Sequence, residues 1–123
     1  MITRGLDDLA VDLTAVINSV ARAFGEGAVR TVEGELDCDP AEPGHLVCWQ
    51  YGVRLEQCVS GERRLAEAVL PMLEAAGWSA HDRSNARELI ARFSRDGADF
   101  TVHVARSGEG VAIVGSTRCI EIG

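Results

Sequence analysis

The sequence contains no lysine, and all twelve of its basic residues are arginine. Lysine forms the Schiff bases of carbonyl chemistry and is the phosphate-binding residue of the P-loop. Its absence therefore excludes both of these enzyme classes. The abundance of alanine, glycine, valine and arginine is typical of a GC-rich coding genome.

Long apolar runs are also missing. No stretch approaches the roughly 20 apolar residues of a membrane-spanning helix, so the sequence predicts no transmembrane segment. The first residues do not resemble a signal peptide, because Asp7, Asp8 and Asp12 interrupt the apolar positions and no basic segment precedes them. At 123 residues and 46% hydrophobic, the chain is predicted to form a single domain, 1–123, around one core.

Four cysteines lie at positions 38, 48, 58 and 119, and none has the C-x-x-C spacing of a metal knuckle or a redox motif. An even count without that spacing favours a framework of two disulfides. Three connectivities are open. We favour Cys38 with Cys48, which would close the connection of a hairpin, and Cys58 with Cys119, which would tie down the chain end.

A zinc site is the alternative use of these cysteines. His45 and Cys48 have H-x-x-C spacing, and Cys38 and Cys58 could complete a set of four ligands. Structural zinc sites usually draw their ligands from two closely spaced pairs, however, and here there is only one such pair. The disulfide framework remains the preferred interpretation, and no cofactor is expected.

The net charge of −7 is concentrated in the first half of the chain. Residues 1–62 hold eleven acidic residues against four arginines, whereas residues 63–123 hold eight of each. Nucleic acid and anionic membranes would be repelled by this acidic half, so a basic protein is the better candidate partner. Acidity that serves only solubility is the simpler alternative.

Apolar periodicity predicts a helix, a long hairpin and a second helix. Residues 6–24 repeat apolar side chains at helical spacing and end at Gly25. Residues 29–58 alternate as two strands joined by a proline-rich and glycine-rich turn at 39–44. Ser60 is the expected N-cap of the second helix, Pro71 should kink or break it, and Gly77 should end it in a left-handed conformation with Trp78 folding back.

The rest of the chain is predicted to be rich in strands, at residues 78–81, 89–93, 100–104 and 111–114, with a short strand in the tail from Cys119. The predicted fold is therefore α+β, in the order α-β-β-α-β-β-β(-β). Two helices should pack on one face of an antiparallel sheet that is braced by disulfides.

Candidate binding residues lie on the predicted hairpin. Trp49 and Tyr51 share one side of their strand and are either core residues or the lining of a ligand groove. The acidic candidates are Glu33, Glu35, Asp37 and Asp39, on or beside the solvent side of the preceding strand.

Catalytic candidates are weak. His81, Asp82 and Ser84 could suggest a hydrolase, but neighbouring strand residues point to opposite faces and no G-x-S-x-G elbow is present. We expect no catalytic residues.

Several short segments that mark helix and strand ends resemble those of small secreted or lipid-anchored actinobacterial proteins of unknown function. They are Leu73–Trp78, Arg95–Gly97 with Phe100–Val102, and Gly115–Cys119. The resemblance covers roughly residues 29–122 and implies an envelope setting without an assigned reaction. The chain lacks the exported N-terminus and the lipid-accepting cysteine of that pattern.

The sequence predicts a non-catalytic, extracytoplasmic binding module, secreted or associated with the envelope, with an unidentified protein or ligand as partner. A cytoplasmic protein with free thiols is the alternative location. The alternative function is an acidic immunity or inhibitor protein that neutralises a basic toxin or nuclease, and a small hydrolase is the third.

Overall fold

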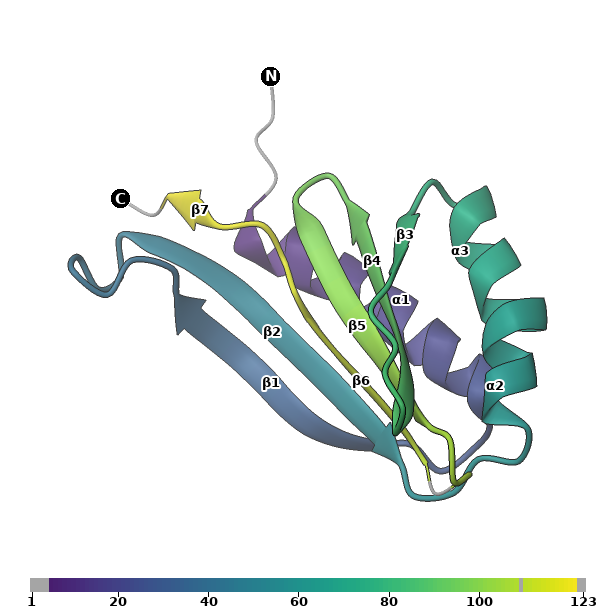
Figure 1. The fold of residues 1–123 in the computed structure, drawn as a ribbon. Coiled ribbons are helices and arrows are strands. Elements are labelled where there is room, and N and C mark those ends of the chain that lie inside the picture. The colour runs from purple at the N-terminus through teal and green to yellow at the C-terminus, as the bar shows by residue number, and fades with distance from the viewer. Residues whose placement is uncertain (1–4, 109, 122–123) are drawn as a thin grey trace.

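The structure is a computed structural model that describes residues 5–108 and 110–121. Its elements follow one another along the chain (Figure 1) as α1 (Leu6–Phe24), β1 (Val29–Asp37), β2 (Leu46–Leu55), α2 (Gly61–Arg64), the π-helical turn η1 (Leu65–Val69), α3 (Leu70–Ala75), β3 (Ser79–Asp82), β4 (Glu88–Arg95), β5 (Ala98–Ala105), β6 (Val111–Ser116) and β7 (Ile120–Glu121). The α+β prediction is confirmed. Five strands follow the second helical segment. The predicted order gave three or four, and the fifth, β7, is the short strand predicted in the tail.

All strands belong to one antiparallel sheet in the order β1-β2-β6-β5-β4-β3, with β7 also paired to β2. The second half of β2 pairs with β6, and its first residues pair with β7. Two residues of β2, 48 and 49, therefore lie opposite three residues, 117–119, between these two pairings. This extra residue is a β-bulge, which re-aims the side chains that follow it.

Helix α1 buries the apolar stripe that its periodicity predicts, and Leu13, Ile17, Val20 and Phe24 are all buried. These side chains join one cluster with the inward side chains of β2, β4, β5 and β6 and with Leu65, Val69 and Leu73 of the second helical segment. The inward side chains are Tyr51, Val53, Leu55, Ala91, Phe93, Phe100, Val102, Val104, Val111 and Ile113. The molecule has two layers, and Figure 1 shows both helical segments on the same side of the sheet.

The second helical segment begins differently from its prediction. Ser60 lies in the left-handed region at φ 58° and makes no side-chain cap. Pro71 lies in the first turn of α3, directly after the π-turn, in which the Leu70 N–H donates to the Leu65 carbonyl. Proline has no N–H to donate, and a wider turn relieves its clash with the preceding carbonyl. The predicted kink is thus a change of helical pitch.

The end of this segment is as predicted. Gly77 has φ +89°, its N–H donates to the Glu74 carbonyl at 3.1 Å, and the Trp78 N–H donates to the Leu73 carbonyl at 3.0 Å. These two bonds define a Schellman motif. Trp78 is buried edge-on against Phe100, with ring centroids 4.9 Å apart. Within the described residues, no helix is long and apolar enough to cross a bilayer.

Candidate interaction surface on the hairpin

Strands β1 and β2 form an arm that reaches past the helices. Figure 1 shows the hairpin extending beyond α1, with β1 along the outer edge of the sheet. Seven of the nine β1 residues are exposed, and the other two are half-buried. The apolar and acidic side chains of β1 alternate as predicted, but neither side of the strand is buried, and Leu36 on its apolar side is 46% exposed.

The pairing register brings the acidic and aromatic candidates to the same face of the arm. Glu33 pairs with Tyr51 and Glu35 pairs with Trp49. Paired residues in an antiparallel ladder point to the same side, so these acids lie on the side of the sheet that the helices cover elsewhere. Trp49 is half-buried at the margin of the core. Tyr51 is buried, and its hydroxyl donates to Asn18 Oδ1 at 2.9 Å.

Three of the four acidic candidates have internal partners. The Glu33 carboxylate accepts a hydrogen bond from Arg30 at 3.0 Å. Asp37 Oδ1 accepts from the Gly44 N–H at 2.8 Å, and Asp39 Oδ1 accepts from the Ala41 N–H at 3.0 Å. Asp37 and Asp39 therefore shape the turn, which needs their carboxylates as acceptors. Glu35 has no such partner among the described residues.

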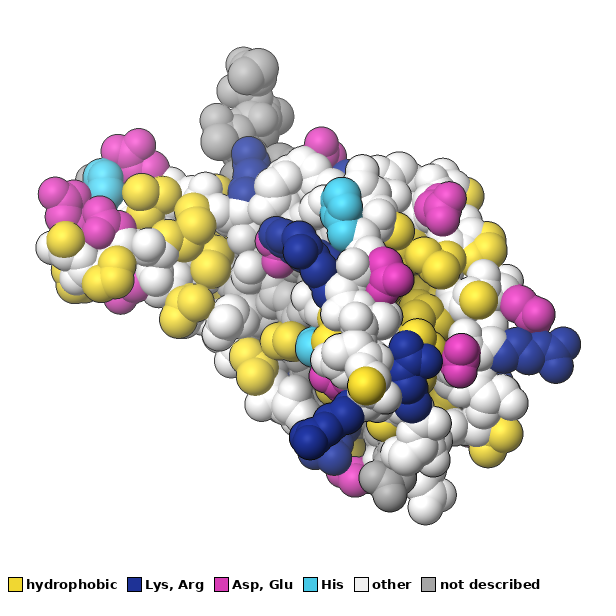
Figure 2. Space-filling view, in the orientation of Figure 1, with side chains coloured by type: hydrophobic (Ala, Val, Ile, Leu, Met, Phe, Trp, Pro, Cys, Tyr) yellow, Lys and Arg dark blue, Asp and Glu magenta, His cyan; other side chains and the backbone are white. Residues whose placement is uncertain are grey.

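Two further acids join this end of the hairpin. His45 Nε2 lies 3.5 Å from the Glu121 carboxylate and 4.0 Å from the Glu42 carboxylate. We call Asp37, Asp39, Glu42, His45 and Glu121 the tip cluster. Figure 2 shows acidic side chains and a histidine gathered at the end of the arm. Sequence reasoning missed Glu121, because only the β2–β7 pairing, Leu46 with Glu121, brings it to the tip.

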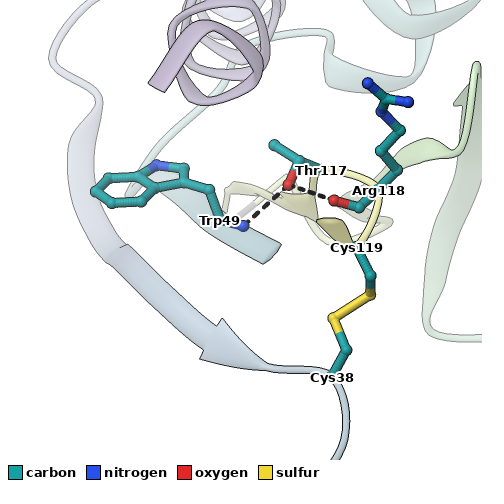
Figure 3. Close-up of a disulfide and its surroundings, with 5 residues drawn as sticks. All are labelled: Cys38, Trp49, Thr117, Arg118 and Cys119. Carbon is teal, nitrogen blue, oxygen red and sulfur yellow. Dashed lines mark hydrogen bonds between the residues drawn. A yellow bond between two sulfur atoms is a disulfide. The ribbon is translucent and has the colours of Figure 1, made fainter. Parts of the chain in front are cut away.

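The structure contains one disulfide, between Cys38 and Cys119, whose Cα atoms are 6.4 Å apart (Figure 3). The predicted pairs Cys38–Cys48 and Cys58–Cys119 are both wrong, since Cys48 and Cys58 are free and buried. Strand β2 separates these two thiols: its ten residues span about 33 Å. Cys58 at the far end of that strand cannot reach the tail that lies beside its start.

Thr117 holds the tail in place beside the disulfide. The Trp49 N–H donates to Thr117 Oγ1 at 2.9 Å, and Thr117 Oγ1 donates to the Arg118 carbonyl at 3.0 Å (Figure 3). The Thr117 N–H in turn donates to the Trp49 carbonyl. The side chain thus supplies, across the bulge, a hydrogen bond that the regular ladder lacks there.

The four ligands of the alternative zinc site do not come together in the part of the chain that the structure describes. The group of potential ligands found there is Cys38, Cys48 and Cys119, whose sulfur atoms all lie within 4.8 Å of one another. His45 faces Glu42 and Glu121 instead. Zinc binds thiolates, and two of these three sulfurs are bonded to each other.

The residues considered for a hydrolase have local structural roles. Ser84 Oγ accepts from the Ile90 N–H at 2.9 Å, and the Ser84 N–H donates to Asp82 Oδ1 at 2.8 Å. Hydrogen bonding from the Ser84 hydroxyl, and then from the Ser84 backbone N–H, lowers the pKa of the Asp82 carboxyl. His81 pairs with Arg92, and Asp82 pairs with Ala91, so the two point to opposite faces of the sheet.

An apolar groove of about 350 Å³ lies between the second helical segment and the β3–β4 edge. Its apolar lining is Leu65, Ala66, Leu70, Ala80, Leu89, Ile90 and Ala91, and Glu62, Asp82 and Ser84 add polar groups. Figure 2 shows this hollow with its apolar floor. Its volume is in the range of small-molecule sites.

Comparison of this chain with protein families, with characterised proteins and with solved structures finds no match.

Proposed function

We propose that the protein is a non-catalytic, extracytoplasmic module that binds a basic protein through the β1–β2 arm. The observation that carries this proposal is the tip cluster, in which four carboxylates and one histidine gather at the end of an arm that extends past the helices. The exposed Glu35, beside Trp49 on the same arm, extends this acidic surface along β1.

The surface fits a protein better than a small molecule. Exposed carboxylates on a projecting arm offer long-range attraction to a basic surface, whereas each exposed ion pair adds only about 0.2–1 kcal/mol. Such charges act mainly on the association rate and on partner choice. An immunity or inhibitor protein that masks a basic toxin or nuclease is a narrower version of the same proposal.

The disulfide supports the extracytoplasmic setting. Disulfides persist in oxidising compartments and are rare in the cytosol of mesophiles. Cys38–Cys119 ties the tail to the base of the hairpin turn, and so it also holds Glu121 in the tip cluster.

The experiment substitutes glutamine for Glu35, Glu42 and Glu121, three acids at the arm whose carboxylates, unlike those of Asp37 and Asp39, accept no hydrogen bond from the backbone of the turn. The matched control places glutamine at Glu26, Glu56 and Glu74, which are exposed away from the tip and change the net charge equally. A photo-crosslinker at position 35 identifies the partner in an envelope fraction of the native host. Stopped-flow association kinetics with the purified partner then compare the variants at low and high salt.

We expect the arm variant to associate on the order of tenfold more slowly at low salt, with a flatter salt dependence, because the steering charges have been removed. The control variant should keep most of the wild-type rate. Equal slowing in both variants would show that only net charge matters and would reject the arm as the binding surface.

The groove favours a second function, the binding of a small apolar ligand. Its apolar lining and volume suit such a molecule, and the η1 turn beside it belongs to a type of helical irregularity that is frequent at functional sites. A neutral, environment-sensitive dye such as Nile red is the probe. Ala66→Trp, which fills the groove, should abolish dye binding, whereas Ala68→Trp on the same turn should leave it intact. Equal binding by both variants would show that the dye does not occupy the groove.

A further inference from the structure

A third sulfur lies against the disulfide. The Sγ atoms of Cys38, Cys48 and Cys119 all lie within 4.8 Å of one another. Cys48 is a buried free thiol, 5% exposed, Cys38 is half-buried and Cys119 is exposed. Thiol–disulfide exchange requires an attacking sulfur that can reach a sulfur of the disulfide, and Cys48 is held close to both.

The fold explains why these three sulfurs meet. Cys48 pairs with Leu36 on β1, and the Cys38 N–H donates to the Leu46 carbonyl at 2.8 Å, so Cys38 lies diagonally across the hairpin from Cys48. On the other side of β2, the bulge at 117–119 places Cys119 beside Cys48. The cluster is thus built by three neighbouring chain segments.

We propose that the cluster is a thiol–disulfide exchange site, in which Cys48 attacks Cys38 and releases Cys119. The Cys48 thiol loses its proton to solvent, and its sulfur forms a new bond to Cys38 Sγ. The bond between Cys38 and Cys119 breaks, and the Cys119 thiolate leaves with the electron pair and takes up a proton. One disulfide is consumed and one is formed, so no oxidant or reductant is needed.

Cys119 is the leaving sulfur because its segment is the freer of the two. Cys38 is anchored in the hairpin by its backbone hydrogen bond to Leu46. Cys119 is exposed, and it is followed by the two-residue strand β7. Exchange would link the two strands of the hairpin covalently, and only hydrogen bonds, those of Thr117 and of β7, would then hold the tail and Glu121 against the arm.

Burial makes the exchange slow near neutral pH. Burial, and then the Asp99 carboxylate, raise the pKa of the Cys48 thiol above 9.0. Asp99 is itself paired with Arg92 at 3.0 Å. Because only the thiolate attacks, the reaction should be followed at mildly alkaline pH.

The experiment traps the released thiol. Folded wild-type protein is incubated at pH 8.5 with iodoacetamide, quenched with acid at intervals, and mapped by non-reducing peptide mass spectrometry. We expect the label on Cys119 together with a new Cys38–Cys48 disulfide. Cys58 is the internal reference: it is equally buried, its thiol donates to the Phe24 carbonyl at 3.3 Å, and it lies outside the cluster. Labelling of Cys119 should be at least tenfold faster than labelling of Cys58, which reports opening of the whole domain.

Cys48→Ala and Cys48→Ser both remove the attacking sulfur and are the matched variants. In either folded variant, Cys119 should stay unlabelled while Cys58 labels at the wild-type rate. Labelling of Cys48 itself with Cys38–Cys119 intact, or labelling of Cys119 no faster than Cys58, would overturn the proposal. Labelling of Cys38 with a Cys48–Cys119 bond would overturn the assignment of Cys119 as the leaving group.

Discussion

The free thiol of Cys58 illustrates how one buried side chain couples stability to pH. It lies at the C-terminal end of α1, where it donates to the Phe24 carbonyl, and it is 7% exposed. Burial raises the pKa of this thiol above 9.0, and the nearby Arg64 guanidinium only partly opposes that effect. The folded state therefore holds its proton at pH values where the unfolded chain releases it.

We predict that the free energy of unfolding falls as the pH rises above 9.0, the ordinary pKa of the thiol. Below that pH both states are protonated and the contribution of Cys58 is fully present; above it the unfolded state binds fewer protons and is favoured. The slope from one thiol cannot exceed about 1.4 kcal/mol per pH unit. Urea unfolding at pH 7.5, 9 and 10 checks this in a Cys48→Ala background, which removes exchange with the disulfide. The added Cys58→Ala change should flatten the profile, and parallel profiles would contradict the prediction.

Helix ends and strand boundaries show how far local patterns determine the elements. The Gly77–Trp78 motif was predictable because a left-handed glycine followed by an apolar residue is a short-range signal, and the structure confirms it. The conformation of Ser60 was not predictable in this way: Ser60 takes the left-handed conformation and does not cap the helix with its side chain. A cap depends on backbone angles that residue type alone does not specify.

The hairpin shows where patterns of alternation stop being informative. Period-two alternation correctly predicted β2, whose Val47, Tyr51, Val53 and Leu55 are buried. The same alternation in β1 predicted a buried side, yet Val32 is half-buried and Leu36 is exposed. Alternation shows which residues share a face, but burial also requires a second layer. Val32 and Leu36 pair with Gly52 and Cys48, so they lie on the face of the sheet opposite the helices, where no helix covers them (Figure 1).

At the scale of the whole molecule, long-range pairing decided what the sequence could not. The predicted α+β class follows from the order of elements. The cysteine pairing depends on where the tail returns, and β7 runs beside the start of β2. The same return brings Glu121 to the tip cluster. Both the disulfide and part of the candidate surface therefore depend on the pairing of β7 with the first two residues of β2.

Loss of the disulfide tests how much this closure stabilises the fold. Cys38 and Cys119 are 81 residues apart, and the chain-entropy model assigns about 4.5 kcal/mol to a loop of that length. This is a large share of the 5–15 kcal/mol that is typical of a domain. The double variant Cys38→Ser/Cys119→Ser should therefore unfold at lower urea concentration and melt roughly 10–20 °C below wild type. Calorimetry with and without a reductant provides the control, because reduction should lower the melting temperature of the wild-type protein and leave the variant unchanged. If the variant has the same melting temperature as the oxidised wild type, the pairings of β2 with β6 and β7 hold the tail without the covalent bond.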